Sequence, residues 1–138
     1  MADRFCKEHR SWLMSRVRGR DTGPERIVRS MLHRLGFRYR LHDPGLPGRP
    51  DLVLPKYRAV VFVHGCFWHR HRGCRRAATP KTNTQFWRRK FQKNRMRDER
   101  NRRKLSALGW KVVLIWECQV YADPHRAVGD AVTSIMGH

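Results

Sequence analysis

Two uninterrupted apolar runs place the strongest constraint on how this chain can fold. Residues 59–63 read AVVFV, and residues 111–116 read KVVLIW. A strand with one face in water alternates apolar and polar residues, whereas a strand covered on both faces is apolar throughout. Both runs therefore predict buried strands in a central sheet that is flanked by helices.

The segments around these runs predict the remaining elements. Pro24, in the first turn after a capping residue (Asp21 or Thr22), begins a helix whose apolar residues repeat at helical spacing as far as Gly36. A half-buried strand is expected over residues 37–41, and a second, over residues 51–54, ends at Pro55. The intervening residues 42–50 contain three prolines and two glycines, which predict a loop.

The second half of the chain continues this alternation. Residues 65–84 are rich in Cys, His, Arg and Gly, and we expect them to be irregular. A basic helix is predicted over residues 85–108, ended by Gly109, and a last helix begins at Asp123. The inner face of that last helix is expected to hold four apolar residues, Val128, Ala131, Val132 and Ile135. The order is that of an α/β fold with a central mixed sheet.

Charge and length limit the class of protein. The chain has 138 residues, and 31 Lys and Arg against 11 Asp and Glu give a formal net charge of +20. We expect a basic arm over residues 1–20 and a single domain over residues 21–138. Such a charge favours nucleic acid as the partner, with an anionic membrane or an acidic protein as alternatives. No apolar run reaches the roughly 20 residues that span a bilayer, which predicts a cytoplasmic protein with reduced thiols.

Asp51 is the first candidate for catalysis. It opens a predicted strand after Pro50, where its carboxylate can bind a hard cation such as Mg²⁺ or can simply cap a turn. In nucleases of the restriction type the next strand carries an acidic residue and a lysine, but here it reads Phe62-Val63-His64. Either catalysis has been lost, or His64 and His69 supply the missing proton transfer.

A second group of residues predicts a Zn²⁺ site. Cys66 and Cys74 lie in a histidine-rich insert, and Cys118 follows the last predicted strand. In a reducing compartment, such a group of Cys and His residues favours zinc binding over disulfide formation. The expected ligands are Cys66, His71, Cys74 and Cys118. Four protein ligands make such a zinc structural and leave His69 free, while Cys6 has no near partner. The alternative is that these cysteines are buried core residues.

Several motifs together resemble one family, the very short patch repair (Vsr) endonucleases. The motifs are PGRPD at 47–51, HGCFWH at 64–69, TQFW at 84–87, GW at 109–110 and WEC at 116–118. Met14-Ser15, Arg20-Asp21-Thr22 and Glu25 are similar to the N-terminal part of that family. The resemblance spans residues 11–120 and implies a restriction-endonuclease-like fold of the PD-(D/E)XK type with a zinc-stabilised insert.

The resemblance implies an activity as well as a fold. Members of the family nick one strand on the 5′ side of the thymine in T:G mismatches, which arise when 5-methylcytosine deaminates. Carried over, Asp51 is the Mg²⁺ ligand together with the backbone carbonyl of Val63, where the family usually has Thr. His69 then activates the attacking water. His64 and Glu25 assist at the scissile phosphate, although Glu25 in a first helical turn can also act on the helix dipole alone.

The resemblance also assigns contacts with DNA and with partners. Phe67, Trp68 and Trp87 match the family's aromatic wedge, which enters the base stack. Met14 and Val17 match residues of an arm that approaches the minor groove. Trp110 and Trp116, in contrast, are expected to pack in the core. The implied context is the cytoplasm of a bacterium, near the nucleoid, where a monomer works beside a cytosine-5 DNA methyltransferase and later repair proteins.

Two other functions stay open on the sequence alone. One is a related nicking or restriction-like endonuclease that recognises a different mismatch or sequence. The other is a zinc-stabilised DNA-binding module without catalysis, which the presence of Asp51, His64 and His69 disfavours.

Overall fold

The computed structural model describes residues 22–137, so the predicted arm with Met14 and Val17 lies outside the described residues. Within this range a four-stranded sheet is flanked by helices. The elements in chain order are α2 (Gly23–Arg34), β1 (Arg40–Leu41), β2 (Leu52–Leu54), the 3₁₀ turn η1 (Pro55–Tyr57), β3 (Ala59–His64), α3 (Cys66–His69), the 3₁₀ turn η2 (Arg75–Ala77), α4 (Thr84–Ala107), β4 (Lys111–Trp116), α5 (Glu117–Ala122) and α6 (Pro124–Met136).

The sheet is mixed, as predicted. Its strand order is β1-β2-β3-β4. The pairs β1–β2 and β2–β3 are antiparallel, and the pair β3–β4 is parallel. In the parallel pair Val61 lies opposite Val113, and His64 lies opposite Trp116. The chain from β3 to β4 passes through α3 and α4, which is the long crossover that parallel strands require.

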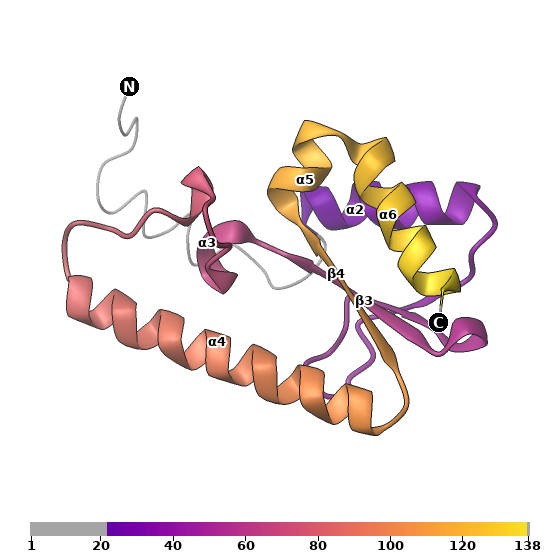
Figure 1. Ribbon diagram of the computed structural model, residues 1–138, viewed down its shortest axis with the longest axis horizontal. Coiled ribbons are helices and arrows are strands. Elements are labelled where there is room, and N and C mark those ends of the chain that lie inside the picture. The colour runs from indigo at the N-terminus through magenta and orange to yellow at the C-terminus, as the bar shows by residue number, and fades with distance from the viewer. Residues whose placement is uncertain (1–21, 138) are drawn as a thin grey trace.

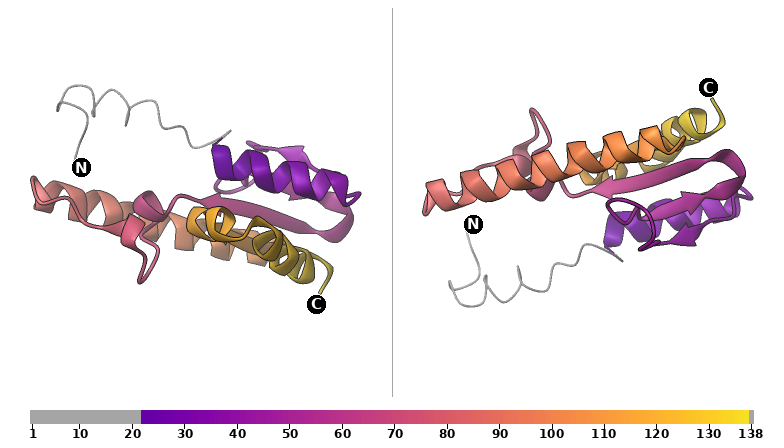
Figure 2. Two further views of the ribbon diagram at one scale, coloured as in Figure 1. Left: turned by 90° about the horizontal axis from the view of Figure 1, so that it is seen from above. Right: turned by 90° about the horizontal axis from the view of Figure 1, so that it is seen from below.

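Helices cover both faces of the sheet (Figures 1 and 2). Helices α2, α5 and α6 lie on one face and α4 lies on the other. Alternate residues of β3 serve the two layers, because Val61 packs in the larger core and Val60 packs with Leu105 of α4. The prediction of a strand buried on both faces is confirmed for β3. It was wrong for β4, an edge strand in which Leu114 is 44% exposed.

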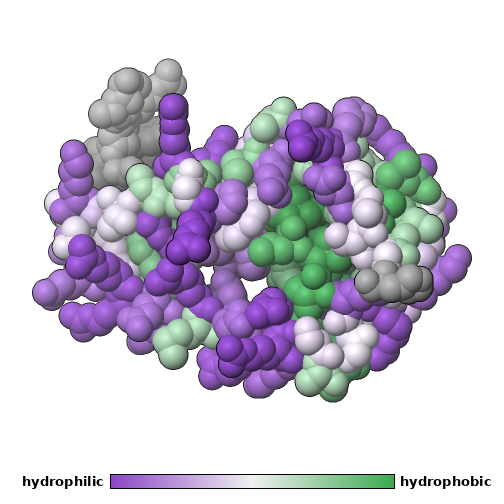
Figure 3. Space-filling view, in the orientation of Figure 1, coloured by the Kyte–Doolittle hydropathy of each residue, from purple (hydrophilic) through white to green (hydrophobic). Residues whose placement is uncertain are grey.

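Helix α4 is largely solvated. Of its 24 residues only Phe91, Asn94 and Leu105 are buried, and most of its exposed side chains are Lys or Arg. Figure 3 shows hydrophilic side chains over most of the visible face, with one apolar patch over the strands. No helix within residues 22–137 is both long and apolar enough to cross a membrane.

Some predicted elements differ from those observed. The first strand is limited to Arg40–Leu41, because its partner β2 has only three residues before Pro55 begins a turn. The segment predicted as irregular contains the short helix α3, and α5 follows β4 directly. Trp116 is half-buried and stacks on His71 at 4.2 Å between ring centroids, so its assignment to the core was wrong.

Candidate functional site

Three clusters of side chains that can bind metals or protons are present in the described part of the chain. The residues of each cluster place their ligand atoms within 4.8 Å of one another. We call them the carboxylate cluster (Glu25, His42 and Asp51), the imidazole cluster (His64, His69 and Asp98) and the cysteine cluster (Cys66, His71, Cys74 and Cys118). Strand β3 and the short helix α3 connect all three, since Val63 contacts the first and the next six residues supply members of the other two.

The carboxylate cluster joins the start of α2 to the start of β2. Thr22 caps α2, which places Glu25 in the first turn, where its side chain is 1% exposed. Asp51 precedes β2, and its Oδ2 accepts a hydrogen bond of 2.6 Å from the backbone N–H of Val63. His42 Nε2 lies 2.7 Å from Glu25 Oε2 and 4.0 Å from Asp51 Oδ1. Two buried carboxylates and an imidazole therefore share one site.

The electrostatics of this site favour a cation. Burial raises the pKa of Asp51 to about 8, the N–H of Val63 opposes that shift, and the nearby Glu25 carboxylate adds to it. Arg29 pairs with Glu25 at 3.2 Å, and a further positive ion beside Asp51 would stabilise its charged form. Hard divalent cations such as Mg²⁺ bind carboxylate and carbonyl oxygens, so the donor set fits such an ion.

The imidazole cluster combines the end of β3, the end of α3 and the middle of α4. His69 Nδ1 lies 2.5 Å from Asp98 Oδ2, and its ring stacks on that of His64 with 3.7 Å between centroids. When Nδ1 donates its proton to Asp98, Nε2 of His69 is left as the acceptor. Burial, together with the neighbouring His69, lowers the pKa of His64 to about 3, so His64 is neutral at neutral pH. The pair can thus accept a proton at His69.

The cysteine cluster has the spacing of a tetrahedral metal site. His71 Nδ1 lies 3.6 Å from the sulfur of Cys66 and 3.4 Å from the sulfur of Cys118. Zinc bonds of about 2.3 Å to sulfur and 2.0 Å to nitrogen at the tetrahedral angle place these atoms about 3.5 Å apart. Three sulfurs and one nitrogen therefore fit Zn²⁺. Burial raises the pKa of the Cys66 thiol to about 12, and a bound cation would offset that cost.

Helix α5 contacts the insert that carries Cys66 and Cys74. Glu117, the first residue of α5, accepts a hydrogen bond of 3.0 Å from the backbone N–H of Cys66 through Oε1. Cys118, the next residue, brings its sulfur to His71. Residues about fifty positions apart therefore fix the start of α3.

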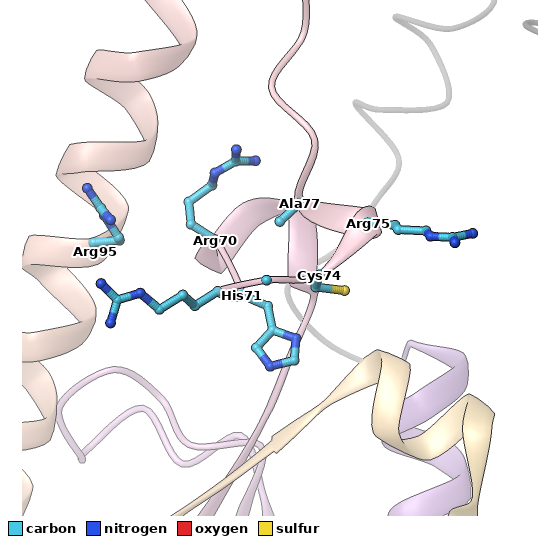
Figure 4. Close-up of a pocket in the computed structure, with 8 residues that line it drawn as sticks. Arg70, His71, Cys74, Arg75, Ala77 and Arg95 are labelled. Carbon is cyan, nitrogen blue, oxygen red and sulfur yellow. The ribbon is translucent and has the colours of Figure 1, made fainter.

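A basic pocket of about 730 Å³ adjoins the cysteine cluster (Figure 4). Arg95 of α4 lines it on one side, and Arg70, Arg72 and Arg75 of the insert line it as well. The guanidinium of Arg70 also lies 3.9 Å from the ring centroid of Phe91. Four arginines around one open pocket favour an anionic ligand, and a DNA phosphate is one such group.

The three predicted wedge residues lie together. Phe67 and Trp68 on α3 have ring centroids 5.0 Å apart, and Trp87 on α4 lies 5.6 Å from Phe67. All three are half-buried, and Phe91 beneath them is 5% exposed. Phe86, which sequence reasoning did not single out, is 57% exposed beside Trp87. The rings of Phe67 and Trp87 therefore pack on the buried Phe91, and all three wedge rings remain partly accessible to solvent.

Sequence reasoning placed most of these residues but missed Asp98 and His42. Asp98 and Glu99 are the acidic residues of the basic helix α4, and Glu99 is engaged by Arg102 and Arg103. Beside Glu99 in a basic helix, Asp98 resembles a solvated acidic residue, so the sequence carries no signal for its contact with His69. His42 lies in a loop that the sequence describes only by its prolines and glycines, and nothing in that pattern singles it out.

Comparison with known proteins identifies the family. A family model described as DNA mismatch endonuclease Vsr matches residues 2–76. The type II nicking enzyme V.XorIIP of Xanthomonas oryzae pv. oryzae is 49% identical over 87% of this chain and 88% of its own length. The DNA mismatch endonuclease Vsr of Escherichia coli K12 is 46% identical over 86% of this chain and 75% of its own length. The chain therefore belongs to the Vsr family of DNA mismatch endonucleases.

Proposed function

We propose that this endonuclease nicks the thymine strand of T:G mismatches on the 5′ side of the thymine. The observation that carries the proposal is the junction of two clusters at the end of β3. The N–H of Val63 binds Asp51, and the next residue, His64, stacks on the His69–Asp98 pair. A cation site and a proton acceptor thus lie beside each other, as hydrolysis of a phosphodiester requires.

The carboxylate cluster holds the cation in this proposal. Asp51 and the backbone carbonyl of Val63 would hold Mg²⁺, as the resemblance implies, and the buried Glu25 lies in the same cluster. A Mg²⁺ ion at this position supplies positive charge that offsets the charge of the phosphate during attack. The burial of Asp51 supports the assignment, because its charged form is disfavoured there and a cation would stabilise it; Glu25 is already paired with Arg29 at 3.2 Å.

His69 is the general base. Its Nδ1 is bound to Asp98, which orients the ring and stabilises the imidazolium that forms when Nε2 takes a proton from water. His64, neutral and stacked on His69, holds the ring plane and offers a hydrogen bond at the scissile phosphate. Asp98 is therefore a positioning residue rather than a catalytic one.

The zinc site is proposed to be structural, in an insert on a PD-(D/E)XK type core. Its four donors leave no position for substrate. The mixed sheet with Asp51 at a strand start supports this assignment of the core. Zinc would hold α3, which carries both Cys66 and His69, against α5.

DNA binding is proposed to use the aromatic cluster and the basic surface together. Phe67, Trp68 and Trp87 enter the base stack, which costs less at a mismatch than at a matched pair. Arginines of α4 and of the basic pocket contact phosphates. Residues 1–20 form an arm that places Met14 and Val17 in the minor groove, beside the single endonuclease domain of residues 21–138.

The biological setting follows from the lesion. T:G pairs produced by deamination of 5-methylcytosine require a cytosine-5 DNA methyltransferase in the same cell, and a nick requires downstream repair proteins. We place this work in the cytoplasm of a bacterium, at the nucleoid, with the protein acting as a monomer because one lesion needs one active site.

A second candidate is nicking in another mismatch or sequence context. The observation that favours it is that several relatives are named type II nicking enzymes, among them V.NmeAIP of Neisseria meningitidis, which is 45% identical. Residues that read flanking bases decide between the two contexts, and both use the same catalytic groups.

The test uses end-labelled duplexes that differ at one base pair, T:G against T:A and C:G, in several flanking contexts with Mg²⁺. We expect cleavage of the thymine strand beside T:G alone. Cleavage of matched duplex or of both strands would move the protein to the restriction-like alternative. Tight mismatch binding without cleavage of any duplex would make it a DNA-binding module.

Replacing Asp98 by Asn should lower the nicking rate about 100-fold, because a neutral amide neither stabilises the imidazolium nor fixes the tautomer of His69. Single-turnover rates over a pH series measure the effect. Glu99→Gln is the matched control on the same helix, since Glu99 pairs with Arg102 and Arg103 and not with His69. An unchanged rate and pH profile for Asp98→Asn would remove the pair from the mechanism.

A further inference from the structure

His42 holds an unusual backbone conformation beside the carboxylate cluster. Its φ of 48° lies in the left-handed region, which non-glycine residues seldom adopt without compensation. Its backbone N–H donates to the carbonyl oxygen of Asp51 at 3.2 Å. The loop is therefore pinned to the residue before β2, and the imidazole is held at the buried carboxylates rather than turned to solvent.

The imidazole nitrogen is placed where a cation would need a ligand. Nε2 lies 2.7 Å from Glu25 Oε2 and 4.0 Å from Asp51 Oδ1, and the second distance is too long for a hydrogen bond. Ligands around one cation, each about 2.2 Å from it, lie about 3–4.5 Å apart. The 4.0 Å between His42 Nε2 and Asp51 Oδ1 therefore leaves room for one ion that touches both side chains, while Glu25 also pairs with Arg29.

We propose that His42 is a nitrogen ligand of the catalytic cation, so that this site binds Mn²⁺ more tightly than Mg²⁺. The inference rests on the proposed role of Asp51 as the cation ligand and deepens it. Mg²⁺ prefers oxygen donors and keeps most of its water, whereas first-row transition-metal cations accept imidazole nitrogen readily. A site that adds one imidazole to the oxygens of Asp51 and Val63 therefore suits Mn²⁺ better than a site built of oxygens alone.

The competing explanation is that His42 only donates a hydrogen bond to Glu25. His42→Gln separates the two, because the glutamine amide can donate to Glu25 but offers no imidazole nitrogen to a cation. His33→Gln is the matched control, since His33 is exposed at the end of α2. Zinc-loaded protein is used throughout, so that added Mn²⁺ does not enter the cysteine cluster.

The experiment measures cation binding directly, without reference to nicking. Free Mn²⁺ is counted by electron paramagnetic resonance during titration, and Mg²⁺ is measured by competition against it. Loss of an outer-shell partner already lowers metal affinity about 10–100-fold, so loss of a direct ligand should weaken Mn²⁺ by at least about tenfold. Mg²⁺ affinity should change little. Pulsed spectra should show ¹⁴N coupling to bound Mn²⁺ in the parent and in His33→Gln, and no such coupling in His42→Gln.

Each outcome decides between the proposals. Identical Mn²⁺ to Mg²⁺ affinity ratios in the parent and His42→Gln, or unchanged ¹⁴N coupling, would overturn the role of His42. If His42→Gln does not fold, the His64→Gln and His69→Gln variants test whether either of these histidines is the nitrogen ligand. Coupling to ¹⁴N that survives in both variants supports His42 as the ligand, and absence of coupling in the parent overturns that role. Asp51→Asn tests the underlying site separately. Unchanged affinity for both cations in that variant would overturn the cation site itself, whatever His42 does.

Discussion

Replacing Asp51 by Asn is expected to abolish nicking while mismatch binding is nearly unchanged. The amide oxygen can still accept the hydrogen bond from Val63, but the charge that holds the cation is lost. Charge stabilisation by a metal ion is worth several kcal/mol, so the rate should fall about 10³-fold or more. Single-turnover cleavage of a T:G duplex measures the rate, and a gel-shift titration without divalent cation measures binding.

Folding of this variant should be at least as stable as that of the parent. The pKa of Asp51 is raised to about 8, which means that its charged form is disfavoured in the folded protein and a neutral side chain removes that cost. Asp130→Asn, an exposed change on α6, is the matched control and should alter neither rate nor stability. Normal nicking by the Asp51 variant would show that the cation site lies elsewhere.

Much of the sheet could be predicted because its sequence pattern depends on burial alone. Residues 111–116 form β4 as predicted, and residues 59–63 form β3 with His64 added. Helices α2 and α6 were also predicted near their observed bounds, since a capping residue and a proline mark the start of each. Local chemistry and burial point in the same direction at these elements.

The elements that were missed depend on distant residues. Helix α3 has four residues and no side-chain cap of its own, and its first N–H is bound by Glu117 from across the fold. A pattern read along the chain contains no trace of such a contact. Asp98 is missed for the same reason, because it meets His69 only after α4 has packed beside α3.

The sequence predicts the candidate site best where the residue type limits the possible chemistry. Three cysteines and a histidine have few roles in a reduced protein, and the predicted set is the set that the fold brings together. The carboxylates are different, because Asp51 and Glu25 are ordinary at their positions and become a site only through shared burial. His42 joins them through a left-handed backbone turn that no spacing rule predicts.

Removal of zinc is expected to have the second large effect. Zinc binding to a structural site is folding free energy, about 10–16 kcal/mol in small zinc domains. Here the large core between the sheet and α2, α5 and α6 does not contain the insert, so only part of that sum should reach the rest of the fold. Cys118→Ser should lower the midpoint of thermal unfolding by about 10 °C or more and remove one equivalent of zinc from the purified protein.

Loss of zinc should also stop nicking, although no zinc ligand belongs to the catalytic groups. Helix α3 begins at Cys66 and ends at His69, so a shift of the cysteine cluster moves the general base away from Asp98. Cys6→Ser is the matched control, because the sequence leaves Cys6 outside the site, and it should retain zinc, stability and rate. Protein that folds and nicks normally with no bound zinc would reduce the cysteine cluster to a group of packed thiols. Stable but inactive Cys118→Ser protein would instead place the whole effect of zinc in the position of α3.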